Sequence, residues 1–349
     1  MTGRERVLAA LDHRRTDRIP IAMVCASLNL PAREALEELL LRTRGITVDA
    51  YLGPLIDIVG IGPSYIGPAL PERTDIWGVR RAKVSYGSGA YDEIEHYPLS
   101  EIREMSQLDS YPWPSADWFD YSDIPRKIKA EREGADRCLM ASNGNIFESS
   151  WYMRGFQQFF FDLMDDPVLA EAIMDRVLDF FLEYFDRILT AAEGGIDLVF
   201  TADDLGGQRG LLMSREMWEK HIKPRHVRLN AMIHSRGAKV IYHSDGAVME
   251  VVDGLMDAGI DVLQALQLDA EGMDAEILKD TFGDRLCFEG GVSVQKILPF
   301  GTADEVRNEV RRLIRILGRD GGYILGPSHA IQAGTPPENI LAMFDAAVE

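Results

Sequence analysis

Two strand-like segments of this 349-residue chain end at a histidine. Residues 240–246 run from an apolar strand into His243, with the carboxylate of Asp245 two residues later and a glycine that allows a turn. Residues 323–329 repeat the pattern and end at His329. Imidazole and carboxylate groups at strand ends can bind a metal or transfer protons. In a barrel of alternating strands and helices, such groups meet at one rim.

Further polar residues follow predicted strands in the same half of the chain. They are Asn143, Asp203, Asp204, Gln264, Gln267 and Glu289. We expect them to converge with the two strand-end histidines, because the carboxyl ends of parallel strands share one rim. Structural interpretations stay open, since Asp203 and Asp204 could cap the next helix and Asn143 could belong to a turn. If Glu289 is buried, its carboxyl group must be paired or have a raised pKa.

The two histidines and the nearby aspartate predict a metal centre. Two imidazoles and a carboxylate are ligands that zinc accepts, and an open fourth position makes such a site catalytic. We therefore predict zinc bound by His243, Asp245 and His329. The same side chains could instead serve as acid, base and substrate anchor without a metal.

The elements that would position these residues alternate regularly from residue 137 onward. Strands are predicted at 138–141, 197–201, 239–242, 262–265, 286–289 and 323–325, with helices between them. Two more strands, at 19–24 and 56–59, bring the number to eight. The pattern predicts an α/β fold of the TIM-type (β/α)8 class. An open doubly wound sheet is less favoured, because no Gly-x-Gly-x-x-Gly follows a strand.

We expect one barrel domain over residues 1–349, with an N-terminal helical extension that begins at Thr2. An insert at roughly residues 60–115 should contain a β-hairpin, with strands at 76–79 and 83–86. Single long helices are expected at 147–164 and at 215–236. The latter carries His221, His226 and His234 beside lysines and arginines, which is typical of a solvated helix face.

Composition excludes several classes of partner. Lys+Arg 37 against Asp+Glu 56 gives a net charge of −19, which repels nucleic acids and anionic membranes. Cys25, Cys138 and Cys287 are too few and too widely spaced for a disulfide framework, and we expect all three to be buried and reduced. The N-terminus lacks the apolar core of a signal peptide, and no uncharged apolar run approaches bilayer length. A cytoplasmic location is expected.

Several motifs resemble the uroporphyrinogen decarboxylase superfamily. They are residues 4–11, 17–20, 77–78, 203–206, 243–246, 288–291, 298–302, 321–325 and 336–340. The resemblance spans nearly the whole chain and implies a TIM barrel, but a fold alone does not decide a reaction. It implies two branches: cofactor-independent decarboxylation of uroporphyrinogen, and corrinoid-dependent methyl transfer.

For the decarboxylase branch, the resemblance implies an arginine-rich stretch after the first strand that holds the substrate carboxylates. Residues 23–29 occupy that position and contain no arginine. Asp57, Tyr152 and His329 do match that branch's aspartate, tyrosine and histidine. The alternative is therefore a metal-free decarboxylase of a tetrapyrrole or related carboxylic acid, but the lost arginines count against it.

For the methyltransferase branch, the resemblance implies zinc bound by a His-x-Cys pair and a later cysteine. The matching residues here are His243, Asp245 and His329, so a carboxylate and an imidazole replace both thiolates. Such ligands leave zinc more acidic, which suits polarising an ether or phenol oxygen. We therefore expect an O-demethylating methyltransferase with a small methylated donor, such as an aryl methyl ether. Cobalamin would be carried by a partner corrinoid protein.

Roles follow for the remaining residues. Glu289, Asp204 and Tyr152 are expected to be catalytic, and Asn143, Asp203, Gln264 and Asp57 are expected to bind substrate. Aromatic residues that could line a donor pocket are Tyr65, Tyr86, Trp113, Trp151 and Tyr152. A non-catalytic barrel that delivers a corrinoid or tetrapyrrole is a further alternative, and the sequence is compatible with a homodimer.

Overall fold

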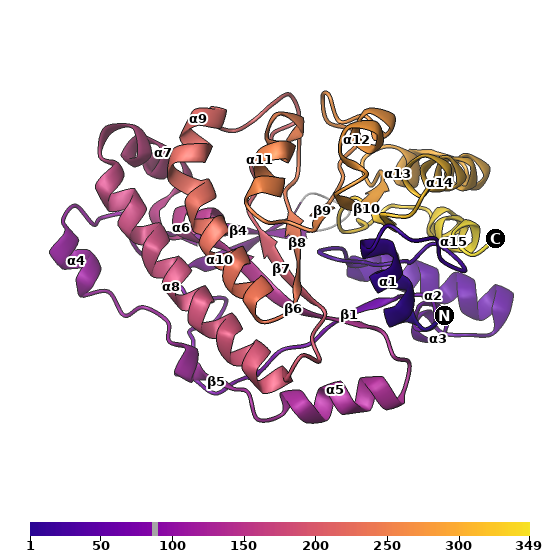
Figure 1. Ribbon diagram of the computed structural model, residues 1–349, viewed down its shortest axis with the longest axis horizontal. Coiled ribbons are helices and arrows are strands. Elements are labelled where there is room, and N and C mark those ends of the chain that lie inside the picture. Colours follow the sequence, from indigo (N-terminus) through magenta and orange to yellow (C-terminus); the bar gives the residue numbers. More distant parts are fainter. Residues whose placement is uncertain (86–89) are drawn as a thin grey trace.

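Seven parallel strands form the central sheet of the computed structural model, which describes residues 1–85 and 90–349. In spatial order they are β1 (Ile58–Gly60), β6 (Cys138–Asn145), β7 (Leu198–Ala202), β8 (Lys239–His243), β9 (Val262–Gln264), β10 (Cys287–Val292) and β11 (Tyr323–Pro327). The sheet curls, and helices pack around its outer side (Figure 1). Spatial order follows chain order, as successive crossovers of one hand require.

The segment around Ile21 lies between the two edges of this sheet. Ile21 forms isolated parallel bridges with both Ile56 and Leu325, so it connects the β1 side to β11 and completes a TIM-type barrel. The strand predicted at 19–24 is thus reduced to single bridges. Pro20, within the predicted strand, has no N–H to donate to a neighbouring strand. Cys25 adopts a left-handed conformation with φ 50°, which ends the extended segment.

Most helices lie on the outside of the barrel. They include α2 (Leu30–Arg44), α8 (Pro167–Ala192), α10 (Lys223–Ser235), α11 (Val252–Asp257), α12 (Ala275–Phe282), α14 (Ala303–Leu317) and α15 (Pro337–Ala346). The N-terminal helix α1 (Gly3–Leu11) closes one end of the barrel, where Val7 and Ala10 join the interior cluster. Smaller elements are α3 (Val48–Leu52), α5 (Ile124–Glu133), α13 (Ile297–Phe300) and the 3-10 turns Ala116–Trp118 and Met249–Val251.

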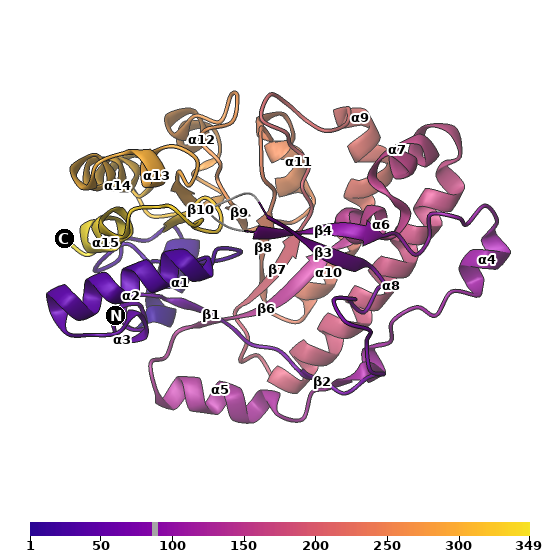
Figure 2. The same ribbon diagram turned by 180° about the vertical axis from the view of Figure 1, so that it is seen from behind.

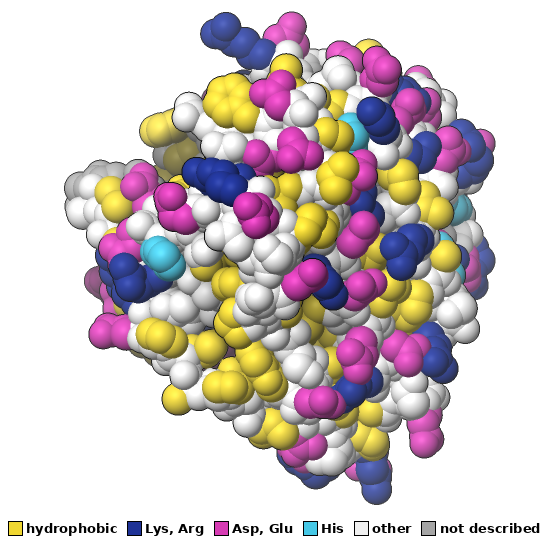
Figure 3. All heavy atoms as spheres, turned by 90° about the vertical axis from the view of Figure 1, so that its left-hand side faces the viewer, with side chains coloured by type: hydrophobic (Ala, Val, Ile, Leu, Met, Phe, Trp, Pro, Cys, Tyr) yellow, Lys and Arg dark blue, Asp and Glu magenta, His cyan; other side chains and the backbone are white. Residues whose placement is uncertain are grey.

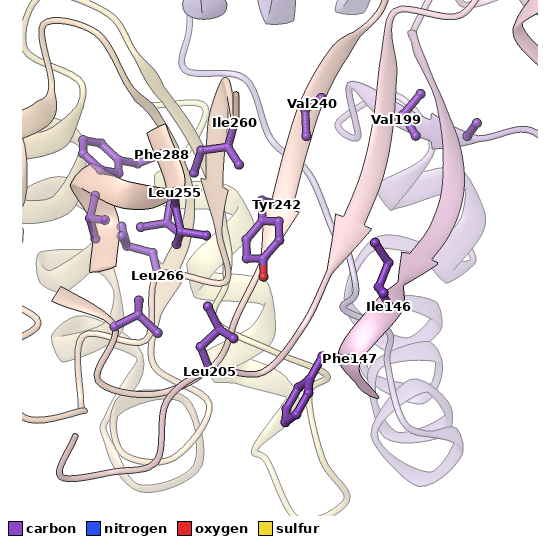
Figure 4. Packing of buried hydrophobic residues seen from close by; sticks show 14 of the residues in the cluster. Ile146, Phe147, Val199, Leu205, Val240, Tyr242, Leu255, Ile260, Leu266 and Phe288 are labelled. Carbon is purple, nitrogen blue, oxygen red and sulfur yellow. The ribbon is translucent and has the colours of Figure 1, made fainter. Parts of the chain in front are cut away.

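Strand alternation decides which side chains enter the barrel. Along β8, Ile241 packs in the interior cluster, whereas Val240 and Tyr242 pack between the sheet and the helices. Figure 4 shows Val240 and Tyr242 on this outer layer with Val199 of β7. Because successive side chains of a strand point to opposite faces, His243 shares the inward face with Ile241.

The insert contains a hairpin that uses residues 83–85 of one predicted strand, but its partner strand is not the predicted one. β3 (Arg80–Ser85) pairs antiparallel with β4 (Ala90–His96), and Figure 2 shows the hairpin crossing in front of the barrel strands. Residues 76–79 are not a strand, because the Asp75 carboxylate accepts hydrogen bonds from two backbone N–H groups there and forms a turn. Of the predicted strand 83–86, the last residue lies outside the described residues. Other elements are α4 (Met105–Asp109) and the pair β2 (Ser64–Tyr65) and β5 (Phe119–Asp120).

Two predicted helices are interrupted. The helix expected at 147–164 is divided into α6 (Ile146–Arg154) and α7 (Phe156–Asp165), because Gly155 has φ 95°, which no helix accommodates. The helix expected at 215–236 consists of α9 (Arg215–Met217), a π-helix at Trp218–Ile222 and α10. Its predicted solvated face is also wrong: His221 and His226 are buried, and His234 alone of the three is exposed.

Other expectations concern the surface and the cysteines. Cys138 and Cys287 are buried, as predicted, whereas Cys25 is exposed because it lies in the loop that follows the shortened first strand. In the described part of the chain, no helix combines the length and apolarity needed to cross a bilayer. Acidic and basic side chains alternate over the face shown in Figure 3, where no large basic area gathers.

Candidate functional site

His243 occupies the last position of β8 and lies opposite Gln264 of β9. The Gln264 amide donates through Nε2 to the Val24 carbonyl oxygen at 2.9 Å, so its Oε1 is the atom that faces His243 Nδ1, at 2.5 Å. Nδ1 must therefore carry the proton, and Nε2 presents a lone pair. Metal-binding histidines are oriented in this way by a second hydrogen bond.

Two groups of possible metal ligands meet at this imidazole. One combines His243 with the carboxylates of Asp204 and Asp245, and the other combines it with Cys25 and His329. Within each group the ligand atoms lie within 4.8 Å of one another. His329 Nε2 lies 4.0 Å from an Asp245 carboxylate oxygen, so the groups adjoin. The three predicted ligands thus lie near one another but are divided between two groups.

The loops after β7 and β8 hold the two aspartates together. Asp204 accepts a hydrogen bond from the Asp245 backbone N–H at 2.8 Å, and its carboxylate lies 3.5 Å from His243 Nε2. Gly246 has φ 86° and packs so closely against the Gly206 backbone that a side chain would clash there. The predicted turn after Asp245 therefore depends on glycine.

Asp203 lies beside Asp204 but has a different environment. It is fully buried, and its two oxygens accept hydrogen bonds from the N–H groups of Phe147 and Glu148 at 2.9 and 2.8 Å. His226 of α10 contacts the same carboxylate through Nε2 at 2.6 Å. Asp203 thus caps α6, the helix that follows the neighbouring strand β6, and its oxygens are occupied within the protein.

Glu148 is a candidate that the sequence analysis missed. Burial, together with the charges of Asp204 and Asp203, raises the pKa of Glu148 to about 8. The Tyr152 hydroxyl donates to its Oε1 at 2.6 Å. A carboxyl group that stays protonated near neutral pH can act as a general acid. The signal in the sequence is the i,i+4 spacing of Glu148 and Tyr152 on one helix face.

Glu289 lies inside the barrel on β10 and is fully buried. Neither carboxyl oxygen has a hydrogen bond of normal geometry among the described residues, although Gln264 and the Val24 backbone lie near it. Burial raises its pKa well above the usual range, as the sequence analysis required of an unpaired carboxyl group. A Cβ at Gly326 would lie 2.5 Å from Glu289 Oε1, so the glycine makes room for this side chain.

Asp57 is not brought to this site. It precedes β1, at the end of the barrel that α1 closes, and it is buried. Its carboxylate contacts Arg6 and Arg18, each at 2.7 Å, and the Ile21 N–H at 2.8 Å. This network fastens the N-terminal segment to the barrel and leaves Asp57 without access to a ligand at the opposite rim.

An aromatic cavity of about 500 Å³ is formed by β6, α6, α8 and the insert. Its lining includes Tyr65, Trp77, Phe119, Tyr152, Phe180, Phe181 and Tyr184, with the polar residues Asp75, Arg81, Ser142, Asn143, Asn145 and Ser149. Tyr152 connects it to Glu148. Arg81 is paired with Asp75 at 2.7 Å. Of the predicted aromatic residues, Trp113 and Trp151 do not line the cavity, and Tyr86 lies outside the described residues.

A smaller cavity of about 230 Å³ is lined by His329 and Asp245 together with Gln267. Gln267 accepts a hydrogen bond from the Gly246 N–H at 2.9 Å and so supports the loop that carries Asp245. The polar cavity thus adjoins His329 and Asp245 directly, whereas the aromatic cavity is connected to Asp204 only through Tyr152 and Glu148.

Comparisons with known proteins agree with this architecture. Residues 82–349 match the family model described as uroporphyrinogen decarboxylase (URO-D). The chain is 24% identical over 263 residues to uroporphyrinogen decarboxylase from Methylococcus capsulatus, which covers 72% of this chain and 70% of that protein. A second relative, uroporphyrinogen decarboxylase from Alkalilimnicola ehrlichii, is 22% identical over 263 residues, or 70% of this chain and 66% of that protein.

Among solved structures, a methyltransferase from Methanosarcina mazei is similar, with a TM-score of 0.72 over 99% of this chain and 98% of that chain. At 19% sequence identity this likeness concerns the fold alone. The family model covers most of the chain, including β6 to β11 and every residue of the two ligand groups except Cys25. The chain therefore belongs to the uroporphyrinogen decarboxylase family.

Proposed function

We propose that this protein is a methyltransferase that moves a methyl group from a small methylated donor to a corrinoid carried by a partner protein. The observation that carries the proposal is the pair of histidines, His243 and His329, beside carboxylates. Glu148 and Tyr152 connect Asp204 of this group to an aromatic cavity. An aryl methyl ether is the favoured donor class, because aromatic walls bind a planar aromatic ring by edge and face contacts.

The charges of the site favour this reaction over decarboxylation of a tetrapyrrole. A substrate with several carboxylates needs cationic side chains to hold it. Among the residues that line the aromatic cavity, Arg81 is the one cation, and Asp75 already neutralises it. Residues 23–29, at the edge of the site, contain no arginine. The decarboxylase names of the relatives keep the alternative reaction as the second candidate.

The ligand types suit zinc, because His243 and His329 offer neutral imidazoles and Asp245, 4.0 Å from His329, offers a carboxylate. When bound, zinc would withdraw electrons from the ether oxygen as a Lewis acid. Gln264 holds the His243 ring so that Nε2 faces the site, and Asp204 holds the backbone of Asp245.

Glu148 would supply the proton that the reaction consumes. The carbon–oxygen bond would break with its electron pair left on the oxygen, which gains a proton, while cob(I)alamin on the partner supplies the electron pair of the new bond to the methyl carbon. Glu148 is protonated at neutral pH because its pKa is about 8, and Tyr152, which contacts it, faces the cavity. Asn143 lines the same cavity and can hydrogen-bond the donor. We assign Glu289 no step in the transfer, because its side chain is fully buried inside the barrel.

The test is turnover with methoxylated aromatic donors and cob(I)alamin, measured both as phenol release and as loss of cob(I)alamin absorbance. We expect His243→Ala to abolish turnover, with His96→Ala, an exposed histidine of β4, as the matched control. Release of carbon dioxide from uroporphyrinogen by metal-free protein would overturn the proposal in favour of the decarboxylase. Binding of corrinoid without turnover in either variant or the parent would favour a delivery protein.

A further inference from the structure

Cys25 is a potential metal ligand that the sequence analysis placed in the core. It is exposed, and its Sγ lies within 4.8 Å of a ring nitrogen of both His243 and His329. The residue adopts φ 50°, in the left-handed region that costs an L-residue about 1 kcal/mol or more. Strain of this kind persists only where the surroundings hold the backbone in place, and two sets of contacts hold this loop.

One side chain connects Cys25 to the first histidine. Gln264 accepts from His243 Nδ1 through Oε1 and donates through Nε2 to the carbonyl oxygen of Val24, the residue before Cys25. The amide is fully buried and has both ends occupied. A single planar group therefore sets the separation between the histidine ring and the backbone that carries the thiol.

Backbone hydrogen bonds connect the same loop to the second histidine. Leu28 and Ile331 form an isolated parallel bridge. The Asn29 N–H donates to the Ile331 carbonyl at 2.9 Å, and the Ile331 N–H donates to the Ser27 carbonyl at 2.8 Å. These contacts lie two to four residues from Cys25 and two residues from His329. The loop is thus attached on both sides to the segments that carry the imidazoles.

The chemistry of the three groups is that of a catalytic zinc site. One thiolate and two imidazoles are ligands that zinc prefers, and three protein ligands leave a fourth position open. A sulfur ligand also selects zinc over magnesium, calcium and manganese, which prefer oxygen. The alternative group around Asp204 and Asp245 offers two oxygens and would lack this selectivity.

We propose that Cys25 is a direct metal ligand and that the resident ion is bound by Cys25, His243 and His329. Asp204 and Asp245 then lie beside the ion rather than in its coordination sphere. This inference rests on the metal centre of the proposed function, but not on methyl transfer itself, and it revises the ligand set that includes Asp245.

The test uses Co²⁺ alone as the probe, added to the full-length protein after chelation. A thiolate ligand gives an intense near-ultraviolet charge-transfer band, which imidazole and carboxylate ligands do not. We expect the parent protein to show this band and Cys25→Ser to lose it, with at least about 100-fold weaker metal binding. Cys25→His should restore affinity without the band. Cys138→Ala removes a buried thiol of β6 and should keep the band, which controls for nonspecific binding to other cysteines.

Three results would overturn the inference. One is tight Co²⁺ binding by the parent protein without the band, with loss of affinity in Asp245→Ala, which would assign the ion to the aspartate group. Another is a band that survives Cys25→Ser. The third is the absence of any metal binding, which removes the metal centre as well. Turnover with a methylated donor is measured separately, so methyl transfer without a thiolate band would refute Cys25 ligation and leave the proposed function standing.

Discussion

Replacing Gln264 tests whether one buried amide organises the site. Gln264→Leu removes both of its hydrogen bonds, to His243 Nδ1 and to the Val24 carbonyl, and leaves two buried polar groups unpaired. Each unpaired group costs about 1–3 kcal/mol, so the free energy of unfolding should fall by about 2–6 kcal/mol. Metal affinity should fall about 10–100-fold, as for other residues that orient a histidine ligand.

Gln264→Glu separates the two contacts. A glutamate still accepts from His243 but cannot donate to Val24, so the histidine stays oriented while the Cys25 loop loses its attachment. We expect this variant to bind Co²⁺ but with a weakened thiolate band. Gln157→Leu, at an exposed amide of α7, is the matched control and should change neither quantity.

The assay combines urea unfolding, followed by circular dichroism, with Co²⁺ titration at a temperature where every variant is folded. A Gln264→Leu variant that loses stability yet binds metal within twofold of the parent would refute the reasoning. Gln264 would then be a structural residue of the barrel with no positioning role.

Two further predictions concern other residues. Burial and two neighbouring aspartates raise the pKa of Glu148 to about 8, so turnover should decline as pH rises through that value and the acid form is lost. Glu148→Gln should lower kcat by about 10²–10⁴ and remove this decline, whereas an unchanged pH–rate profile would contradict the assigned role. Arg154 is buried against Asp162 at 2.6 Å and donates to backbone carbonyls of the insert. Arg154→Met should therefore lower the free energy of unfolding, measured by urea denaturation, by about 3–5 kcal/mol. Adding Asp162→Asn to this variant removes the unpaired buried charge and should restore part of the lost free energy.

Local sequence patterns were sufficient to predict most strands and helices of the barrel. One of the helices expected between successive strands is α14, which forms because Thr302 and Glu305 make a capping box and buried residues recur every three or four positions. The later strands were recognised from short apolar runs, which suit a parallel sheet covered on both faces. The histidine at the end of β8 followed from the same reasoning.

Other elements depended on contacts between distant segments. The first strand is reduced to bridges at Ile21, which only the closure of the ring reveals. The hairpin uses residues 90–96, because Asp75 turns the chain where a strand was expected. His226 is buried because α10 packs its face against Tyr242 and Asp203, and the sequence around it does not record that orientation.

The sequence by itself determined the kinds of chemistry available, because imidazole and carboxylate groups placed at strand ends must converge when parallel strands form a barrel. The tertiary structure alone decided which of them meet. Cys25 and His243 lie far apart in the chain, and their proximity depends on barrel closure and on the bridging amide of Gln264. The tertiary structure also separates Asp57 from the site. Asp57 precedes its strand, whereas the site residues follow theirs, so they lie at opposite ends of the barrel.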